Sequence, residues 1–242
     1  MSHILNLPFI VFLYGPAGSG KGTQAAEILR RYPEYEYIEV GQEIRNFLAA
    51  NLHGVDPALK QLAEHIDEDV NQKGIALRFD VWRQVWDHQI KQKTLSGKKL
   101  LIDGIFREYN QSMFVANFVN EQAVSCVLFV LHISVEEAIK RLSTRFAVPG
   151  SSMIYSTYLE AKGACREGVE PTARADDKDP EVVRNRYRTQ YEFKFGECIS
   201  IYQRVTGGEV YIIDATKSID DVFVQIHQNL ENFSKKVSRL SI

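Results

Sequence analysis

The stretch "FIVFLYGPAGSGKGTQ", from Phe9 to Gln24, decides how the rest of the chain is interpreted. Its first six residues are apolar, β-branched or aromatic, which is typical of a buried strand. A glycine-rich turn follows, and a helix begins near Lys21. Strand, turn and helix together gather backbone amides at one point, where the helix dipole adds positive charge. The turn is therefore predicted to hold a phosphate group.

The residues of this turn differ in what they offer a phosphate. Gly15, Gly18 and Gly20 let the main chain approach the oxygens, Lys21 supplies a cation, and Thr23 offers a hydroxyl to Mg²⁺. An ordinary glycine turn between a strand and a helix is the alternative interpretation. The phosphate interpretation is favoured because the motif has its strand before it and its helix after it.

Composition limits the other possibilities. The 242 residues are 45% hydrophobic, enough for one large domain with small insertions, and the net charge of -2 argues against nucleic-acid binding. Three widely spaced cysteines indicate neither a disulfide framework nor a zinc site, so we expect a cytoplasmic protein. Asn6 and Pro8 interrupt the N-terminal apolar stretch, which argues against a signal peptide, and no segment is predicted to enter a membrane.

Short apolar runs recur along the chain at 100–102, 127–133 and 210–213. Helical patterns lie between them, opened by the capping boxes 134–137 and 218–221, and the first of these helices is expected to run to about Arg145. The alternation predicts an α/β fold, an open parallel sheet of five strands with helices on both faces and with ligands at the carboxyl ends of the strands. We expect a core domain at 1–37, 98–146 and 174–242, with insertions at 38–97 and 147–173.

Charged residues near these strand ends add to the phosphate hypothesis. Asp103 follows a buried run, where a carboxylate beside a phosphate loop suits Mg²⁺ or one of its waters. Arg141 and Arg145 lie four residues apart on a predicted helix, so they share a face and call for an anionic partner. A polar turn and a solvated arginine pair are the alternatives. His132 is interpreted as a core or strand-end residue.

Five segments resemble the nucleoside monophosphate kinases, and adenylate kinase most of all. The loop ends in "GKGTQ", with Gly22 after the lysine. The others are "EVGQEIRNF" at 39–47, "LLIDGIFREYNQ" at 100–111, "RLSTR" at 141–145, and "TARADDKDPEVVRNRYRTQY" at 172–191. A looser match is "KGIALRFD" at 73–80. The chain departs from the family's pattern at Ala17, Val40, Gln42 and Phe106.

The resemblance implies a role for each matching residue. The ATP-binding residues would be Gly15, Gly18, Ser19, Gly20, Lys21, Gly22, Thr23, Arg141 and Arg145. The AMP-binding residues would be Gly41, Arg45, Ala76, Leu77, Gly104, Arg107, Gln111, Arg174 and Arg186. The catalytic residues would be Lys21, Arg107, Arg145, Arg174 and Arg186. Magnesium would be held by Thr23 and, through water, by Asp103.

These roles describe an enzyme that works by positioning. Phosphoryl transfer between two phosphates crowds negative charge together, and converging arginines would stabilise it. The expected reaction moves the γ-phosphoryl group of ATP to AMP in a Mg²⁺-dependent way, with the insertions closing over both nucleotides to exclude water. A UMP or CMP kinase, a low-turnover nucleotide-binding regulator and a GTPase-like switch are the alternatives. We expect a monomer whose partners are small nucleotides, without structural zinc because Cys165 alone cannot hold it.

Overall fold

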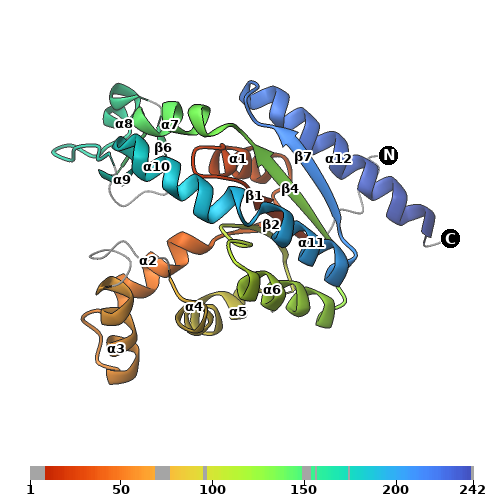
Figure 1. The fold of residues 1–242 in the computed structure, drawn as a ribbon, viewed down its shortest axis with the longest axis horizontal. Coiled ribbons are helices and arrows are strands. Elements are labelled where there is room, and N and C mark those ends of the chain that lie inside the picture. The colour runs from red at the N-terminus through yellow and green to blue at the C-terminus, as the bar shows by residue number, and fades with distance from the viewer. Residues whose placement is uncertain are drawn as a thin grey trace.

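The computed structural model describes most of the chain. The residues described are 9–68, 77–94, 97–148, 154–155, 157–173 and 175–240. Figure 1 shows a central sheet with helices around it and two groups of helices that extend to the same side. Within the described residues, no helix combines the length and the apolar character needed to cross a membrane.

The sheet has five parallel strands, which confirms the predicted fold class. Its strand order is β2-β3-β1-β4-β7. The strands are β1 (Ile10–Tyr14), β2 (Tyr35–Glu39), β3 (Lys99–Asp103), β4 (Cys126–His132) and β7 (Glu209–Asp214). Four of them coincide closely with the apolar runs in the sequence. Because β1 lies in the middle of this order, the glycine turn that follows it sits at the centre of the sheet.

The helices of the core lie around this sheet. They are α1 (Lys21–Arg31), α6 (Tyr109–Glu121), α7 (Val135–Ser143), α9 (Ala175–Lys178), α10 (Pro180–Tyr187), α11 (Phe195–Thr206) and α12 (Ile219–Leu240), with the π-helical turn η3 (Arg188–Glu192). In both predicted capping boxes the serine caps its helix, as expected. Ser134 Oγ accepts a hydrogen bond from the Glu137 amide at 3.2 Å, and Ser218 Oγ accepts one from the Asp221 amide at 3.1 Å. These caps fix where α7 and α12 begin.

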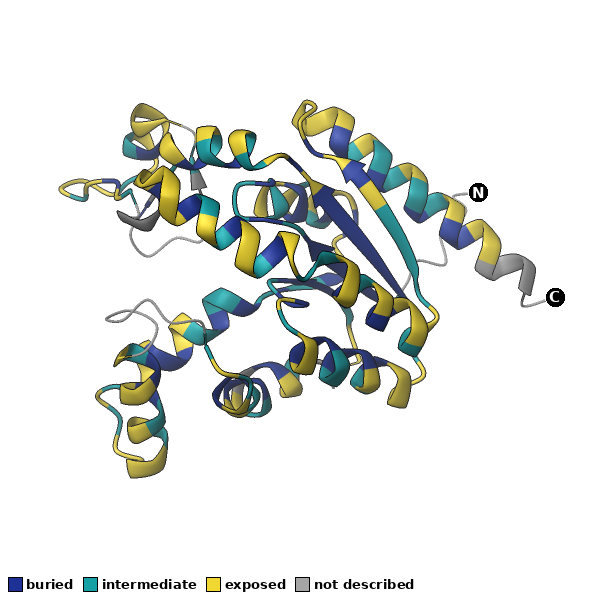
Figure 2. Cartoon of the chain, viewed as in Figure 1, coloured by how far each residue is buried: buried dark blue, intermediate teal, exposed yellow. Residues whose placement is uncertain are grey.

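The hydrophobic core is built on the central strands. All five residues of β1 are buried, and six of the seven residues of β4 are buried as well. Strands buried on both faces read as continuous apolar runs, which is why the sequence located them. Figure 2 shows these strands in dark blue between helices that are buried only along one side.

The first insertion carries a second, smaller core. Its helices are α2 (Val40–Asn51), α3 (Pro57–Ile66), α4 (Phe79–Val85) and α5 (Lys91–Thr94), with the π-helical turn η2 (Trp86–Ile90). Phe47, Ile66 and Val85 are among its buried residues. The nearly buried Glu43 of α2 accepts a hydrogen bond from Lys93 Nζ of α5 at 2.6 Å, which ties the first helix of the insertion to the last.

The second insertion is short and lies in the group of helices beside α7 and α10, apart from the first insertion (Figure 1). It contains the strands β5 (Phe146–Ala147) and β6 (Ile154–Tyr155), which pair antiparallel, and helix α8 (Tyr158–Gly163). Lys162 contacts Glu170 within it. Strand β2 runs to Glu39, two residues past the boundary at 37 that the sequence suggested. The division into a core and two insertions as separate domains stays a prediction.

Candidate active site

The glycine turn lies between β1 and α1 and folds around the side chain of Lys21. Lys21 Nζ donates hydrogen bonds to the carbonyl oxygens of Gly15, at 3.2 Å, and Pro16, at 3.0 Å. Gly15 has a φ of 151°, and a Cβ built on it would lie 2.4 Å from the carbonyl oxygen of Leu131, so no larger residue fits there. The first turn of α1 contains no acidic residue, which leaves the positive end of the helix dipole available to an anion.

Asp103 lies beside this loop because strands β1 and β3 are neighbours. Leu13 is paired with Asp103 across the two strands. The Asp103 carboxyl is buried, and among the described residues its Oδ1 atom has no hydrogen-bond partner. Burial raises the pKa of Asp103, while the charges of Lys21 and Arg107 oppose that rise. Burial likewise lowers the pKa of Lys21, and Asp103 opposes it. The lysine and the carboxylate are therefore close electrostatic partners.

The segment after β3 holds Arg107 in the same place. Phe106 has a φ of 62°, a left-handed conformation that is rare for a bulky residue. Its ring is buried and packs edge-on against Phe12 at 5.3 Å and Tyr202 at 5.6 Å. The amide of Arg107 then donates to Gln111 Oε1 at 2.9 Å. The backbone on both sides of Arg107 is thus fixed by buried groups.

The Arg107 side chain reaches solvent although protein surrounds it on most sides. The side chain is exposed, yet nearby protein atoms lower its pKa by desolvation, and the charge of Asp103 opposes that effect. The neighbouring Gly104 lies within van der Waals reach of this side chain: a Cβ built there would lie 3.7 Å from Arg107 Nη2 and from the amide nitrogen of Gly41.

Arg141 lies across the phosphate loop. Its guanidinium donates to the carbonyl oxygens of Gly18, at 3.4 Å, and Ala215, at 2.8 Å, and to the carboxylate of Glu137 at 2.7 Å. Helix α7 ends at Ser143, so the expected helix to about Arg145 is too long by two residues. The expectation that Arg141 and Arg145 share a helix face is wrong for that reason, and each arginine has its own carboxylate.

Arg145 and Arg186 meet on one buried carboxylate. Arg145 Nε donates to Asp177 Oδ2 at 3.0 Å, and Arg186 Nη1 donates to Asp177 Oδ1 at 3.2 Å. The Asp177 side chain is 1% exposed. Sequence reasoning matched Asp177 to the family's R-x-D-D stretch but assigned it no role in the site. Two arginines from distant segments are therefore held together at the end of α7.

Two of the residues expected to bind an acceptor, Gly41 and Arg45, lie on α2. Gly41 is in the first turn of α2, and Arg45 is one turn further along. Arg45 Nη2 contacts Glu39 Oε1 at 3.2 Å, and Glu39 is another residue that sequence reasoning missed. Leu77 packs against both hydrophobic cores. Ala76 and Arg174 lie outside the described residues.

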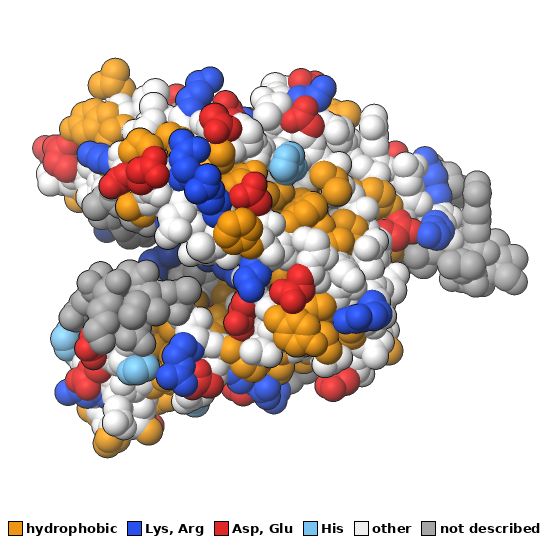
Figure 3. Space-filling view, in the orientation of Figure 1, with side chains coloured by type: hydrophobic (Ala, Val, Ile, Leu, Met, Phe, Trp, Pro, Cys, Tyr) orange, Lys and Arg blue, Asp and Glu red, His pale blue; other side chains and the backbone are white. Residues whose placement is uncertain are grey.

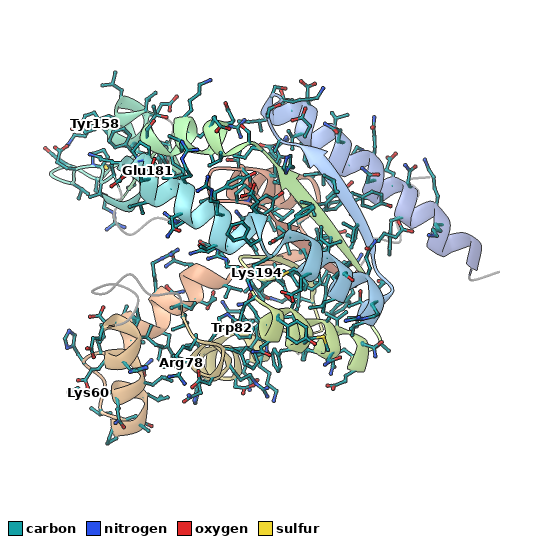
Figure 4. The ribbon with its side chains drawn as sticks, in the orientation of Figure 1. Lys60, Arg78, Trp82, Tyr158, Glu181 and Lys194 are labelled. Carbon is teal, nitrogen blue, oxygen red and sulfur yellow. The ribbon has the colours of Figure 1, made fainter. Side chains whose placement is uncertain are left out.

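The two sides of the site face each other across a hollow. Figure 3 shows the surface indented between the part formed by α7 to α10 and the part formed by α2 and α3, with blue Lys and Arg side chains along the indentation. In Figure 4, Tyr158 and Lys60 mark the outer parts of these two groups, and Trp82 lies nearer the sheet. The loop and Asp103 lie at the strand ends between them.

Two other expectations concern residues outside this cleft. His132 ends β4, as expected, and its Nδ1 atom lies 2.8 Å from the hydroxyl of Tyr191. Cys165 follows α8 and is half-buried, and all three cysteines are free thiols. Among the described residues, no group of three or more His, Cys, Asp or Glu side chains is placed to hold a metal ion.

The glycine loop at the end of the central strand, with its lysine and neighbouring carboxylate, defines a P-loop protein of the α/β class. A family model described as an AAA domain matches residues 14–150. That match covers more than half of the chain, so the chain belongs to this family of P-loop proteins.

Curated relatives cover nearly the whole chain. An adenylate kinase of Kosmotoga olearia is 29% identical over 229 residues, which are 92% of this chain and 99% of the relative. An adenylate kinase of Pyrococcus furiosus is 28% identical over 232 residues, 91% of this chain and 95% of the relative. An adenylate kinase of Chlamydia pneumoniae is 27% identical over 217 residues, which are 90% of this chain and 95% of the relative. These matches confirm the predicted resemblance: the chain is an adenylate kinase-like phosphotransferase with nucleoside monophosphate kinase activity.

Proposed function

We propose that the chain transfers the γ-phosphoryl group of ATP to AMP and forms two molecules of ADP. The observation that carries this proposal is the arrangement of Lys21, Arg107 and the Arg145–Asp177–Arg186 group around one cleft at the strand ends. Such a set positions two phosphate chains end to end and stabilises the charge that spreads over the transferred group. The names of the relatives supply the choice of adenylate.

The donor would lie on the loop side. The amides of residues 17–22 and Lys21 would hold the β- and γ-phosphates, with the buried Ser19 hydroxyl, which has no partner among the described residues, facing them. Arg141 would lie against the adenine of ATP, since its guanidinium is held between the carbonyl oxygens of Gly18 and Ala215. Arg145 and Arg186, which both bind Asp177, would contact the transferred group. Some of their hydrogen bonds to the Asp177 carboxylate would then be replaced by hydrogen bonds to phosphate oxygens.

The acceptor would lie between β3 and α2. Arg45 and Arg107 would bind its phosphate. Gly41 and Gly104 lie close to each other, and their lack of side chains would leave room for that phosphate. Gln111, with its Oε1 atom taken by the Arg107 amide, would present its amide nitrogen to a base edge. We propose the same general placement for Leu77, while the expected roles of Ala76 and Arg174 stay predictions. A glutamine amide that donates favours adenine N1 over a protonated ring nitrogen.

The side chains beside the loop also fit the binding of a magnesium ion. Asp103 has a buried carboxylate oxygen without a partner among the described residues, and Thr23 lies on the exposed first turn of α1. Carboxylate, hydroxyl and phosphate oxygens are the ligands that Mg²⁺ takes, usually with several waters retained. The ion would neutralise phosphate charge during transfer. Asp103, Thr23 and the loop would hold the hydrated ion and the donor phosphates in register.

An acceptor panel tests the proposal. Purified chain, ATP and Mg²⁺ are mixed with AMP, GMP, CMP or UMP, and nucleoside diphosphates are measured by anion-exchange chromatography. We expect AMP to give the largest kcat/KM, and chelation of Mg²⁺ to abolish turnover. A larger kcat/KM for UMP or CMP would show that the acceptor is that nucleotide and not AMP. Release of phosphate without any nucleoside diphosphate formed from the acceptor would contradict the kinase function.

A further inference from the structure

Glu39 is an acidic residue in the part of the site that should attract a phosphate. It is the last residue of β2, and the strand register pairs it with Asp103 at the end of β3. Both carboxylates thus emerge at the same edge of the sheet, beside the phosphate loop. The charge of Glu39 raises the pKa of Lys21 and of Arg107, although burial, the larger effect, lowers both. Glu39 is therefore an electrostatic neighbour of the site's cations.

Arg45 is the direct partner of this carboxylate. Arg45 Nη2 lies 3.2 Å from Glu39 Oε1 and 3.3 Å from Oε2. Gln42 Oε1 accepts from the same edge of the guanidinium, at 3.1 Å from Nε and 2.8 Å from Nη2. A guanidinium binds a phosphate best through two parallel N–H groups on one edge. The edge formed by Nε and Nη2 is already engaged by Glu39 and Gln42.

The Glu39–Arg45 pair is packed over the first turn of α2. A Cβ built on Gly41 would lie 3.0 Å from Glu39 Oε1 and 3.4 Å from Arg45 Nη1, so the absence of a side chain at Gly41 leaves room for both. The two side chains remain partly open to solvent, with 30% of Glu39 and 43% of Arg45 exposed. A phosphate can therefore reach Arg45 from the cleft, and the pair is weak enough to exchange partners.

We propose that Glu39 competes with the acceptor's phosphate for Arg45 and thereby sets the affinity of the acceptor site. The proposal rests on the proposed function only in assigning Arg45 to the acceptor. A dianionic phosphate must displace the carboxylate from Arg45 and then remain near its negative charge. The neutral part of the acceptor, its base and sugar, does not meet this competition. Glu39 thus weakens binding of the phosphate group selectively.

The test compares binding of a nucleotide with binding of its nucleoside. Isothermal titration calorimetry measures AMP and adenosine on wild type and on Glu39→Gln, which removes the charge and keeps the size. We expect the variant to bind AMP roughly three- to tenfold more tightly and adenosine with unchanged affinity. This gain is the size expected when a partly exposed ion pair no longer has to be broken and the carboxylate no longer repels the phosphate. In steady-state assays, KM for the monophosphate should fall by a similar factor, with a smaller change in kcat.

Two control variants isolate the charge at this position. Glu36→Gln removes an acid from the same strand whose partner is Lys98, at 3.1 Å, outside the cleft. It should leave the AMP affinity unchanged. Glu39→Asp keeps the charge and should bind AMP as wild type does. Thermal melting of each variant shows whether it is folded, and a second neutral variant, Glu39→Ser, repeats the measurement with a smaller side chain.

The outcomes separate this proposal from the proposed function. Unchanged or weaker AMP binding by both neutral variants would overturn the competition, because Glu39 would then hold Arg45 in place for the phosphate. An equal gain for adenosine would also overturn it. If the acceptor panel selects another monophosphate, the same comparison is made with that nucleotide and its nucleoside. If no acceptor is turned over, the kinase function fails, while AMP binding still reports whether Glu39 opposes phosphate.

Discussion

Arg107 owes its position to the residue before it. Phe106 adopts a left-handed backbone conformation, which costs a bulky residue about 1–3 kcal/mol. Its fully buried ring, packed between Phe12 and Tyr202, offsets that cost. A proline could not take this place, because its fixed φ cannot be positive. The aromatic anchor holds Arg107 at the strand end, where it meets Asp103 and Lys21.

At this scale we predict that Arg107 dominates turnover. Arg107→Ala should lower kcat/KM by roughly 100-fold or more, since it removes a preorganised donor from developing charge. Arg107→Lys should recover little, because an ammonium lacks the two-pronged edge of a guanidinium. Arg30→Ala on the exposed face of α1 is the matched control and should keep full activity. A sensor that merely binds nucleotides would instead show weaker affinity in Arg107→Ala and no turnover in wild type.

Residues of the loop were predictable from sequence, whereas the roles of Glu39, Asp177 and Phe106 were not. Lys21 and its glycines lie within one short motif, so spacing alone reveals them. Glu39 becomes part of the site only through the pairing of β2 with β3, and Asp177 only through arginines 32 and 9 residues away. Side chains brought together by the tertiary fold leave no local pattern.

Strand β2 shows the same limit at the scale of the element. Its sequence, "YEYIE", contains two glutamates in five residues, so it lacks the continuous apolar run that marked the other strands. The structure explains the difference: β2 is an edge strand with a single neighbour, β3, and only Tyr35 and Ile38 are buried. A strand that is only partly buried carries polar residues, so a search for continuous apolar runs does not find it.

The opposite edge strand, β7, is tied to helix α12 by charge. Glu209 contacts Lys236 of α12 and accepts a hydrogen bond from the hydroxyl of Tyr211. These partners, Lys236 first, hold the pKa of Glu209 below its ordinary value of 4.5. A depressed pKa means that the folded state gains stability from the charged carboxylate. The gain is present above pH 4.5 and is lost as the pH falls through the folded pKa.

For this element we predict a pH-dependent cost of Glu209→Gln. At pH 7 the variant should lose about 0.5–1 kcal/mol of unfolding free energy, a modest value because Lys236 is largely exposed. Urea denaturation followed by circular dichroism at pH 7, 5 and 3 measures it. The difference between variant and wild type should shrink once the pH is below 4.5. An equal difference at all three pH values would mean that packing, and not charge, accounts for the loss.

At the scale of the whole molecule, the site is assembled from parts far apart in sequence. The loop and Asp103 come from the sheet, Arg45 from the first insertion, and Arg145 and Arg186 from the segments around the second. Figure 1 shows these two groups of helices extending on the same side of the sheet. The alternation of strands and helices in the sequence predicted this architecture, because ligands of open parallel sheets gather at the carboxyl ends of strands.

We predict that a ligand with two heads fills both halves at once. Two adenosines joined by five phosphates should inhibit at roughly 100-fold lower concentration than a non-hydrolysable ATP analogue, since the second head binds at high effective concentration. Inhibition constants from steady-state assays give the ratio. A version with three bridging phosphates is the control and should lose most of the advantage. Equal potency of the long ligand and the ATP analogue would argue against a paired site.

The central position of β1 bears on how the molecule tolerates disturbance. Its five residues are buried and pair with β3 on one side and β4 on the other. Fraying from an edge therefore cannot reach it, and its amide hydrogens should exchange with heavy water only when the entire domain unfolds. The phosphate loop is attached to the most slowly exchanging strand, so thermal opening of either insertion leaves the loop's shape intact.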